Sequence, residues 1–280
     1  MASAVEVYSA CENEIQRDLE EFVETSKDIT QTTARILQEA MTPTNSQGTV
    51  TEKLISMVSE TEDVETPRNL VVQIFAWTSV TSFVAMVGMI LGHTVFSSMA
   101  ASVADGNNAM ILACVLLPAF GCLVTRMYDE DIRYSDPYKD SEVRYLSLWF
   151  ALIQGVFVGR SIHNIYVSAQ PPMCLTPAAI AVCYGYMPHS AGRNRVALIS
   201  SSLSAAMVTN LTFGSFAGSL TQAFVSLTFL YVAACGLMQQ FIFGNVNRKT
   251  AIHSYQHALV SLLIAVKGLF FLIFGSYVYA

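Results

Sequence analysis

The histidines near the end of the chain are the residues whose spacing most directly suggests chemistry. His253 and His257 lie four residues apart, which is about one turn of a helix. Two imidazoles at this spacing could hold a metal ion, but no third ligand is evident, so we expect interfacial polar side chains rather than a metal site. The pair is also a candidate pH-responsive element, because an unperturbed imidazole titrates near about pH 6.5.

Lys267 is the second ionisable group that the sequence singles out, because it lies within a long apolar run. An ionisable residue in a membrane helix is a functional hypothesis by default, although a lysine can also extend its ammonium towards the membrane interface. No Asp or Glu follows Glu142 in the chain. Lys267 must therefore pair with amides, hydroxyls, carbonyls or water, or be neutral. Two interpretations of Lys267 therefore stay open. The side chain has a role in helix packing or gating, or its ammonium reaches the membrane interface.

Catalytic chemistry finds little support in the sequence. Ser215 with His253 or His257 could suggest an intramembrane serine protease, but the serine and the histidines fall near opposite membrane faces in the expected topology. The six cysteines show neither a CxxC pair nor metal-ligand spacing, so we expect small buried apolar side chains. We predict that the protein is not an enzyme, and we expect no catalytic residue, cofactor, metal or nucleic-acid partner.

The distribution of charge divides the chain into two parts. The chain is 53% hydrophobic and 13% charged, whereas soluble domains usually carry about 25% charged residues. Residues 1–65 hold 14 of the 21 acidic residues, and the stretch from Val143 to Ala280 holds none. A soluble domain needs both signs of charge on its surface, so the second part is expected to be membrane-embedded. We predict an acidic cytosolic arm, residues 1–65, followed by a multi-pass membrane domain, residues 66–280.

The arm has the apolar pattern of a helix. Apolar residues recur at spacings of three and four in a seam that two polar positions interrupt. Three weak heptads rarely form a stable coiled coil, so we expect a partly folded helix on the membrane surface or against a partner. The seam includes Ile15, Leu19, Phe22, Ile29 and Ile36.

Seven apolar segments follow the arm, and they predict the fold class. A helix needs about 20 apolar residues to cross the hydrocarbon core of a bilayer. The fourth segment is short and carries Pro177 and Pro188, and the seventh carries Lys267 and could span fully or only partly. We predict an all-α polytopic membrane helix bundle with about seven transmembrane helices. The segments are 70–92, 108–127, 145–165, 172–189, 196–216, 221–243 and 257–278.

The basic residues next to these segments indicate an orientation. Lys and Arg residues precede the first segment and lie between the second and third, the fourth and fifth, and the sixth and seventh. The alternate loops, 93–107, 166–171 and 217–220, have none. This positive-inside pattern predicts a cytosolic N-terminus, and only Arg160, an expected interface anchor, and Lys267 fall outside it. Seven crossings would put the C-terminus on the far side, whereas a re-entrant last segment would return it to the cytosol.

Several strings in the membrane domain, together with the loop lengths, suggest a known family. Their order resembles the Bax inhibitor-1 family, also called the transmembrane BAX inhibitor motif family, over about residues 57–278. The resemblance implies an endoplasmic reticulum protein that modulates cell death and calcium or stress signalling without catalysis. It also implies membrane protein partners beside the lipid bilayer. The strings are EVRYLSLWFALIQGVFVG, PPMCLTPAAIAVCYGY, LISSSLSAAMVTNLTFGS and HALVSLLIAVKGLFFLIFG.

The chain departs from that family at the gate. The resemblance implies that typical members carry one Asp in the sixth helix and one in the seventh, which form a pH-sensitive pair gating calcium leak. Here Met238 stands at the first position and Ile264 at the second, with Lys267 one turn further on. Calcium prefers several oxygen ligands, usually including carboxylates, so a family-type calcium leak is not expected. The alternative function is an ion channel or transporter with a carboxylate-free pathway past these residues and Gln239 and Gln240.

Overall fold

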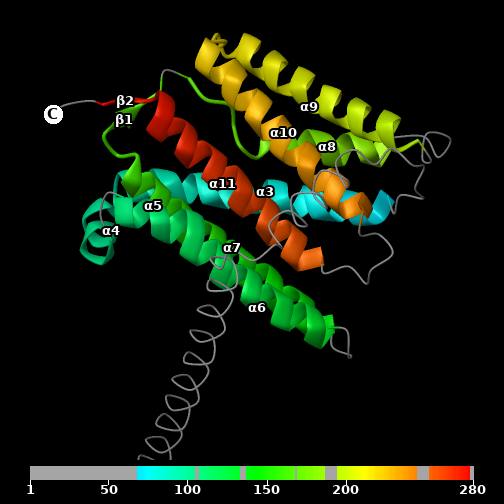
Figure 1. The fold of residues 1–280 in the computed structure, drawn as a ribbon, viewed down its shortest axis with the longest axis horizontal. Coiled ribbons are helices and arrows are strands. Elements are labelled where there is room, and N and C mark those ends of the chain that lie inside the picture. The colour runs from blue at the N-terminus through cyan, green and yellow to red at the C-terminus, as the bar shows by residue number, and fades with distance from the viewer. Residues whose placement is uncertain are drawn as a thin grey trace, which may run out of the picture. The chain divides into compact units, whose positions relative to one another are not determined.

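The computed structural model describes six stretches of the chain, all within the second of its two units, Met57–Ala280. These stretches are almost entirely helical, so the all-α prediction is confirmed at that level (Figure 1). The predicted arm, residues 1–65, lies outside the described residues, and its helical character and boundary stay predictions. The described stretches are 68–104, 107–132, 137–167, 169–186, 194–244 and 252–277.

Each of the seven apolar segments overlaps a helix or a continuous helical run in the described residues, but seven membrane spans are not confirmed. Five of the helices in the described stretches are long and apolar enough to cross a membrane, by length and composition: 68–93, 108–128, 195–216, 222–244 and 252–274. The elements in order are α3 (Arg68–His93), α4 (Ser97–Val103), α5 (Asn107–Ile111), the π-helix η1 (Leu112–Leu116), α6 (Leu117–Ile132), α7 (Pro137–Ser161), β1 (Ile165–Tyr166), α8 (Leu175–Tyr186), α9 (Arg195–Phe216), α10 (Gln222–Gly244), α11 (Ile252–Phe274) and β2 (Ser276–Tyr277).

Two of the predicted spans fall short of the criteria for a membrane-crossing helix. The helix α7 starts at Pro137, earlier than the predicted segment, and its first turns carry Asp140, Glu142 and Arg144. The helix α8 has 12 residues and is therefore only about 18 Å long, whereas the hydrocarbon core is about 30 Å thick. The short helix α4 lies in the stretch that the sequence treats as a loop.

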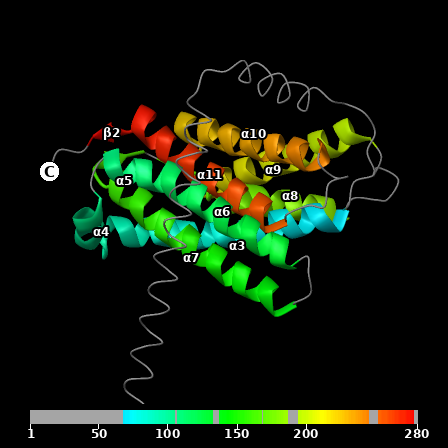
Figure 2. The same ribbon diagram turned by 60° about the horizontal axis from the view of Figure 1, so that its bottom comes forward.

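The helices α3 and α11 lie at the centre of the described bundle. The first packs against α7, α8 and α11, and the second also packs against α6, α7 and α10. Figure 2 shows α6 and α7 on one side of this central pair and α8, α9 and α10 on the other.

The closest helix pair is built from glycines. A Cβ atom on Gly88 or Gly92 of α3 would overlap a backbone carbonyl oxygen of α7, and one on Gly155 or Gly159 of α7 would overlap a carbonyl oxygen of α3. Both helices thus carry a G-x-x-x-G motif, which lets helix backbones approach closely inside a membrane. Sequence reasoning missed this contact, although the two motifs are visible as GMILG and GVFVG.

Polar contacts gather the starts of some helices and the ends of others at one end of the bundle. The Arg68 guanidinium at the start of α3 donates to the carbonyl of Gly185 at the end of α8. Nε of Arg195, the first residue of α9, donates to Oε1 of Gln240 near the end of α10, at 2.9 Å. A contact between a carboxylate and an imidazole, described below, joins the starts of α7 and α11. We call this end, formed by the starts of α3, α7, α9 and α11 and the ends of α8 and α10, the basic end.

The ends of α3, α7, α9 and α11 lie at the other end, which we call the opposite end, and the end of α7 contacts the segment that follows α3 there. The strand β1, after α7, pairs antiparallel with β2, after α11, with Ile165 opposite Tyr277. The ends of α7 and α11 therefore lie side by side. The Arg160 side chain near the end of α7 donates to Ser97 Oγ at the start of α4, at 3.1 Å.

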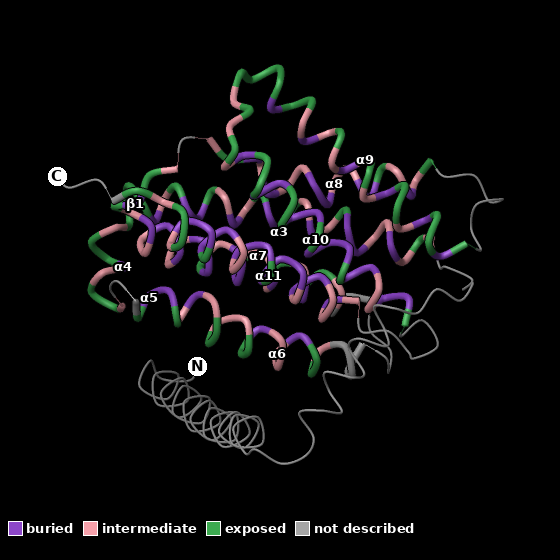
Figure 3. Tube along the Cα trace, turned by 45° about the horizontal axis from the view of Figure 1, so that its top comes forward, coloured by how far each residue is buried: buried purple, intermediate pink, exposed green. Residues whose placement is uncertain are grey.

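Polar side chains are buried within the bundle while many large apolar side chains are exposed. Figure 3 shows how buried and exposed positions alternate along the helices. Ser82, Gln154 and Asn210 are at most 1% exposed, whereas Trp149 and Phe229 are more than 60% exposed. Such large outward apolar surface is unusual for a water-soluble monomer and fits a lipid-facing exterior. The interior amides and hydroxyls then join helices to one another, as in membrane bundles.

Candidate functional site

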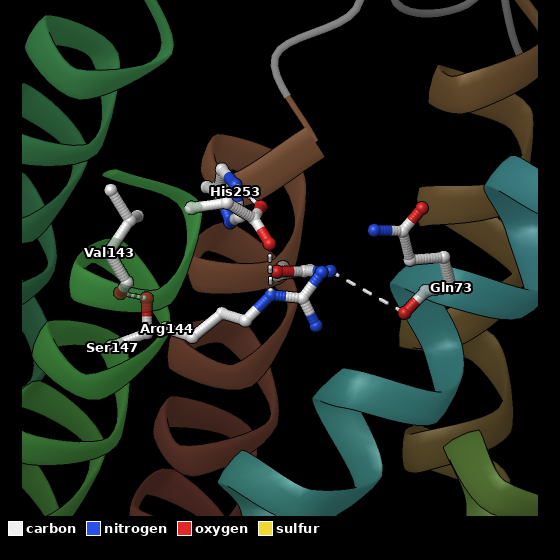
Figure 4. A network of polar contacts seen from close by, with 7 residues as sticks. Gln73, Val143, Arg144, Ser147 and His253 are labelled. Atoms are coloured by element: carbon white, nitrogen blue, oxygen red, sulfur yellow. Dashed lines mark hydrogen bonds and ion pairs between the residues drawn. The ribbon is translucent and has the colours of Figure 1, made fainter. Parts of the chain in front are cut away.

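A polar cluster at the basic end joins three helices (Figure 4). Asp140 of α7 accepts a hydrogen bond from Nε of Arg144, one turn further on, at 2.8 Å. Its second carboxylate oxygen lies 3.0 Å from Nε2 of His253 on α11. The Arg144 guanidinium carbon in turn lies 5.0 Å from the centre of the Trp77 ring on α3. Asp140 therefore acts as the electrostatic link between α7 and α11.

The next turns of α11 continue this cluster into the bundle. Nε2 of Gln256 donates to the backbone carbonyl of Gln73 on α3, at 3.4 Å (Figure 4). Nε2 of His257 lies 3.3 Å from the carbonyl oxygen of Pro118 on α6, and its ring meets the Phe150 ring edge-on with centroids 5.6 Å apart. The helix α6 has glycine at Gly121, where a Cβ atom would overlap the imidazole.

The two predicted histidines are thus brought to one face of α11 but make separate contacts. His253 is 4% exposed and His257 is 1% exposed, so both are buried in the bundle rather than spread over an interface. No group of three or more His, Cys, Asp or Glu side chains suited to a metal ion occurs among the described residues. Whether either imidazole responds to pH stays a prediction.

A buried amide and a π-helical turn form a second polar contact deeper in the bundle. Nε2 of Gln154 on α7 donates to the Ala113 carbonyl in η1, at 2.9 Å, and its Oε1 accepts from Ser261 Oγ on α11, at 3.2 Å. A π-turn opens the regular hydrogen-bond ladder and is frequent at functional sites. Gln154 therefore joins three elements at once. Sequence reasoning did not single it out, although an amide inside an apolar run was a visible signal.

The predicted gate residues of α10 lie in helix-packing contacts. Met238 is 7% exposed and belongs to the apolar core, as does the fully buried Ile264 of α11. Oε1 of Gln239 accepts from Ser202 Oγ of α9 at 3.1 Å. Gln240 accepts from the Arg195 guanidinium, as described above. Both amides thus join α10 to α9.

Lys267 lies in a different part of the bundle from these amides. It follows the start of α11 by 15 residues, about 22 Å along the helix. Gln240 precedes the end of α10 by four residues, about 6 Å. Lys267 lines a cavity of about 400 Å³ near the opposite end, which neither Gln239 nor Gln240 lines. The five candidate gate residues therefore do not form one site.

Comparison with known proteins gives one family. A family model described as Interactor of ZYG-11 matches residues 1–277, almost the whole chain. No curated protein and no solved structure matches the chain.

This match corrects the family expected from the sequence. The chain was expected to resemble the Bax inhibitor-1 family and to modulate cell death and calcium or stress signalling; that prediction is wrong, because the matching family is a different one. The channel alternative and the gate at Met238 and Ile264 rested on the same resemblance and lose that support. The physical reason for the error is that long apolar helices resemble one another in composition, so their order along a chain does not identify a family.

Proposed function

Because the chain belongs to the Interactor of ZYG-11 family, we propose that it is a membrane-embedded binding protein whose polar N-terminal arm engages a ZYG-11 protein. The carrying observation is that the family model spans residues 1–277, which includes both the acidic arm and the apolar helices. A protein of this kind holds its partner at a membrane. The proposed protein binds its partner and does not catalyse a reaction.

The membrane location is supported by the helices themselves. Five of those described are long and apolar enough to cross a bilayer. Large apolar side chains lie on the outside of the bundle and amides lie inside it. Buried amides in hydrocarbon need partners within the protein; Gln154 donates to Ala113 and accepts from Ser261, and the Asn210 Nδ2 donates to Thr176.

We propose seven crossings with the N-terminus in the cytosol. The contacts that gather the starts of α3, α7, α9 and α11 at the basic end support an alternating path, because odd-numbered crossings then all run the same way. The helix α7 would cross with its apolar part, after Arg144. The helix α8 would cross together with the chain that precedes it, from Pro171 onward. The endoplasmic reticulum stays a prediction, which colocalisation of the tagged protein with organelle markers would test.

The arm is the segment that we propose contacts the partner. It carries 14 acidic and four basic residues, so its field would attract a basic surface and speed the encounter. Its apolar seam offers the side chains that a helix needs to bury against that surface once the encounter has formed. An arm with both features favours a protein partner over the bilayer, whose cytosolic face is itself negatively charged.

The binding role is supported by the separation of the groups that catalysis would need. Ser215 lies at the end of α9, at the opposite end of the bundle, whereas His253 and His257 lie at the start of α11, at the basic end. A nucleophile and its base must lie within hydrogen-bond reach. The intramembrane serine protease is therefore not the proposal.

Binding of the full-length chain, purified in detergent, to an immobilised ZYG-11 protein tests the proposal. The wild-type chain should bind saturably. Reversing three charges of the arm together, Glu20→Lys, Glu21→Lys and Glu24→Lys, should weaken binding by about tenfold or more, because each lost ion pair and each new repulsion acts at the contact.

The matched control reverses three charges elsewhere: Asp129→Lys, Glu130→Lys and Asp131→Lys. It changes the net charge by the same amount and should leave binding within about twofold. Absence of binding by the wild-type chain, or an equal loss in both variants, contradicts the arm as the contact.

A further inference from the structure

The cavity beside Lys267 lies near the opposite end of the bundle. Its walls come from the end of α3, the end of α7, β1, the residues before α8 and the last turns of α11. Most of the lining side chains are apolar, and the cavity measures about 400 Å³. The polar lining residues are His93, Tyr166, Gln170 and Lys267.

Lys267 is buried at this cavity without a counter-ion from the described residues. The residue is 6% exposed, no hydrogen bond or ion pair to another described residue satisfies it, and its electrostatic neighbour Cys174 is a thiol that supplies no counter-charge while it is protonated. Neither α3 nor α11 contains an acidic residue, and no Asp or Glu follows Glu142. His93 lines the cavity and is an exposed residue. Its ring centroid lies 4.6 Å from that of His163. Asp105 is the one acid in the loops of this end, and it lies outside the described residues.

A buried ammonium is costly unless an opposite charge or several hydrogen bonds satisfy it. A cavity next to the ammonium leaves room for an external group to do so. The apolar walls would suit a hydrocarbon chain, while the ammonium would suit a phosphate or carboxylate. Both features belong to one class of ligand, the anionic lipid.

We propose that this cavity binds the acidic head of an anionic lipid, with Lys267 as its counter-ion. Phe274, the last residue of α11, follows Lys267 by seven positions, so the Lys267 backbone lies about 10 Å below the helix end. A lipid head group could reach this depth if it lies slightly deeper than the head groups of the surrounding bilayer. This depth is a poor position for a soluble anion, which would have to leave water for an apolar cavity.

Native mass spectrometry of the full-length chain in detergent tests this inference. Four probes are titrated separately: dioleoyl phosphatidic acid, oleate, dioleoyl phosphatidylcholine and inorganic phosphate. One or both of the acidic lipids should bind at least tenfold more tightly than phosphatidylcholine. Strong binding of inorganic phosphate alone would assign the site to a soluble anion and overturn the lipid proposal.

Variants connect the binding to Lys267. Lys267→Met removes the charge at nearly constant length and should abolish the preference for acidic lipids, whereas Lys267→Arg should keep it. The matched control is Arg160→Gln, which removes a basic residue of the same end that does not line the cavity. An unchanged preference in Lys267→Met, or equal losses in Lys267→Met and Arg160→Gln, overturns the proposal.

Two further measurements test whether Asp105 is the counter-ion of Lys267 and whether the lipid lies in this cavity. Asp105→Asn should leave lipid preference unchanged; if acidic lipid binds only after this substitution, Asp105 is the native counter-ion and the proposal fails. Photo-crosslinking of the wild-type chain with a diazirine-bearing oleate needs no variant to fold. Crosslinks should fall within residues 86–93 and 162–172, and crosslinks confined to other segments contradict the site.

Discussion

At the scale of single residues, the sequence identified the side chains but not their partners. His253, His257 and Lys267 stood out because ionisable groups are rare in the apolar half of the chain. The partner of His253 is Asp140, on a helix that precedes it by several elements. Spacing within one segment cannot reveal such a pair, because it depends on how distant helices pack. The same limit hid Gln154 and its acceptor Ala113.

The Asp140 cluster yields a prediction about stability. Asp140→Ala removes the acceptor of both Arg144 and His253 and leaves the buried imidazole nitrogen without its partner. We expect the free energy of unfolding to fall by about 1–2 kcal/mol, since the carboxylate is partly exposed and water replaces some of the lost contact. Thermal unfolding in detergent measures the change.

The matched control for this prediction is Glu142→Ala. Glu142 is an exposed acidic residue two positions further along α7, so its loss changes the net charge equally. We expect its unfolding temperature to stay close to that of the wild type. Equal destabilisation of both variants would mean that general charge, rather than the Asp140 link, stabilises the start of α7.

At the scale of elements, apolar run length predicted the helices well. The predicted segments 70–92, 196–216 and 221–243 agree with α3, α9 and α10 to within two residues. Apolar run length did not predict η1, α4 or the β1–β2 pair, because these depend on side chain-to-backbone contacts and on contacts between segments that are distant in the chain. The length of an apolar run indicates how much apolar surface a segment can bury. Irregular elements such as η1 depend on the other segments against which the chain packs.

The glycine contact between α3 and α7 yields a second prediction about stability. Gly155→Leu places a side chain where a Cβ atom alone would overlap the Ala85 carbonyl oxygen. The two helices must separate, and we expect the free energy of unfolding to fall by about 1–3 kcal/mol or more. Thermal unfolding in detergent, read by the loss of helical circular dichroism, measures it.

Gly185→Ala is the control for the glycine prediction. Gly185 lies in α8, and a Cβ atom there would meet nothing within 4 Å. This substitution should be neutral or slightly stabilising, because alanine is the better helix former. A neutral Gly155→Leu would show that α3 and α7 do not depend on close backbone approach.

At the scale of the whole molecule, the charge distribution carried more information than the local strings did. The absence of acids after Glu142 and the alternating basic loops are the pattern expected of a membrane domain, and several helix starts and ends with basic residues contact one another at the basic end. The order of apolar strings was misleading, because long apolar helices in unrelated proteins resemble one another in composition. Family membership came only from the match over residues 1–277.

The last prediction concerns whether α11 crosses the membrane fully in the proposed topology. The helix α11 has 23 residues and is about 34 Å long, enough to cross a core of about 30 Å. Its end lies beside β1, which follows α7. We therefore expect a full seventh crossing rather than a re-entrant segment, with the N-terminus and the C-terminus on opposite sides of the membrane.

Protease protection in sealed, cytosol-side-out vesicles measures this arrangement. An epitope tag is placed before Met1 and a different one after Ala280. External protease should remove the first tag and spare the second, because only the N-terminus faces the cytosol, and detergent should expose both. Removal of both tags without detergent would mean an even number of crossings, with α8 or α11 failing to span. Removal of the second tag alone would invert the orientation that the basic loops predict.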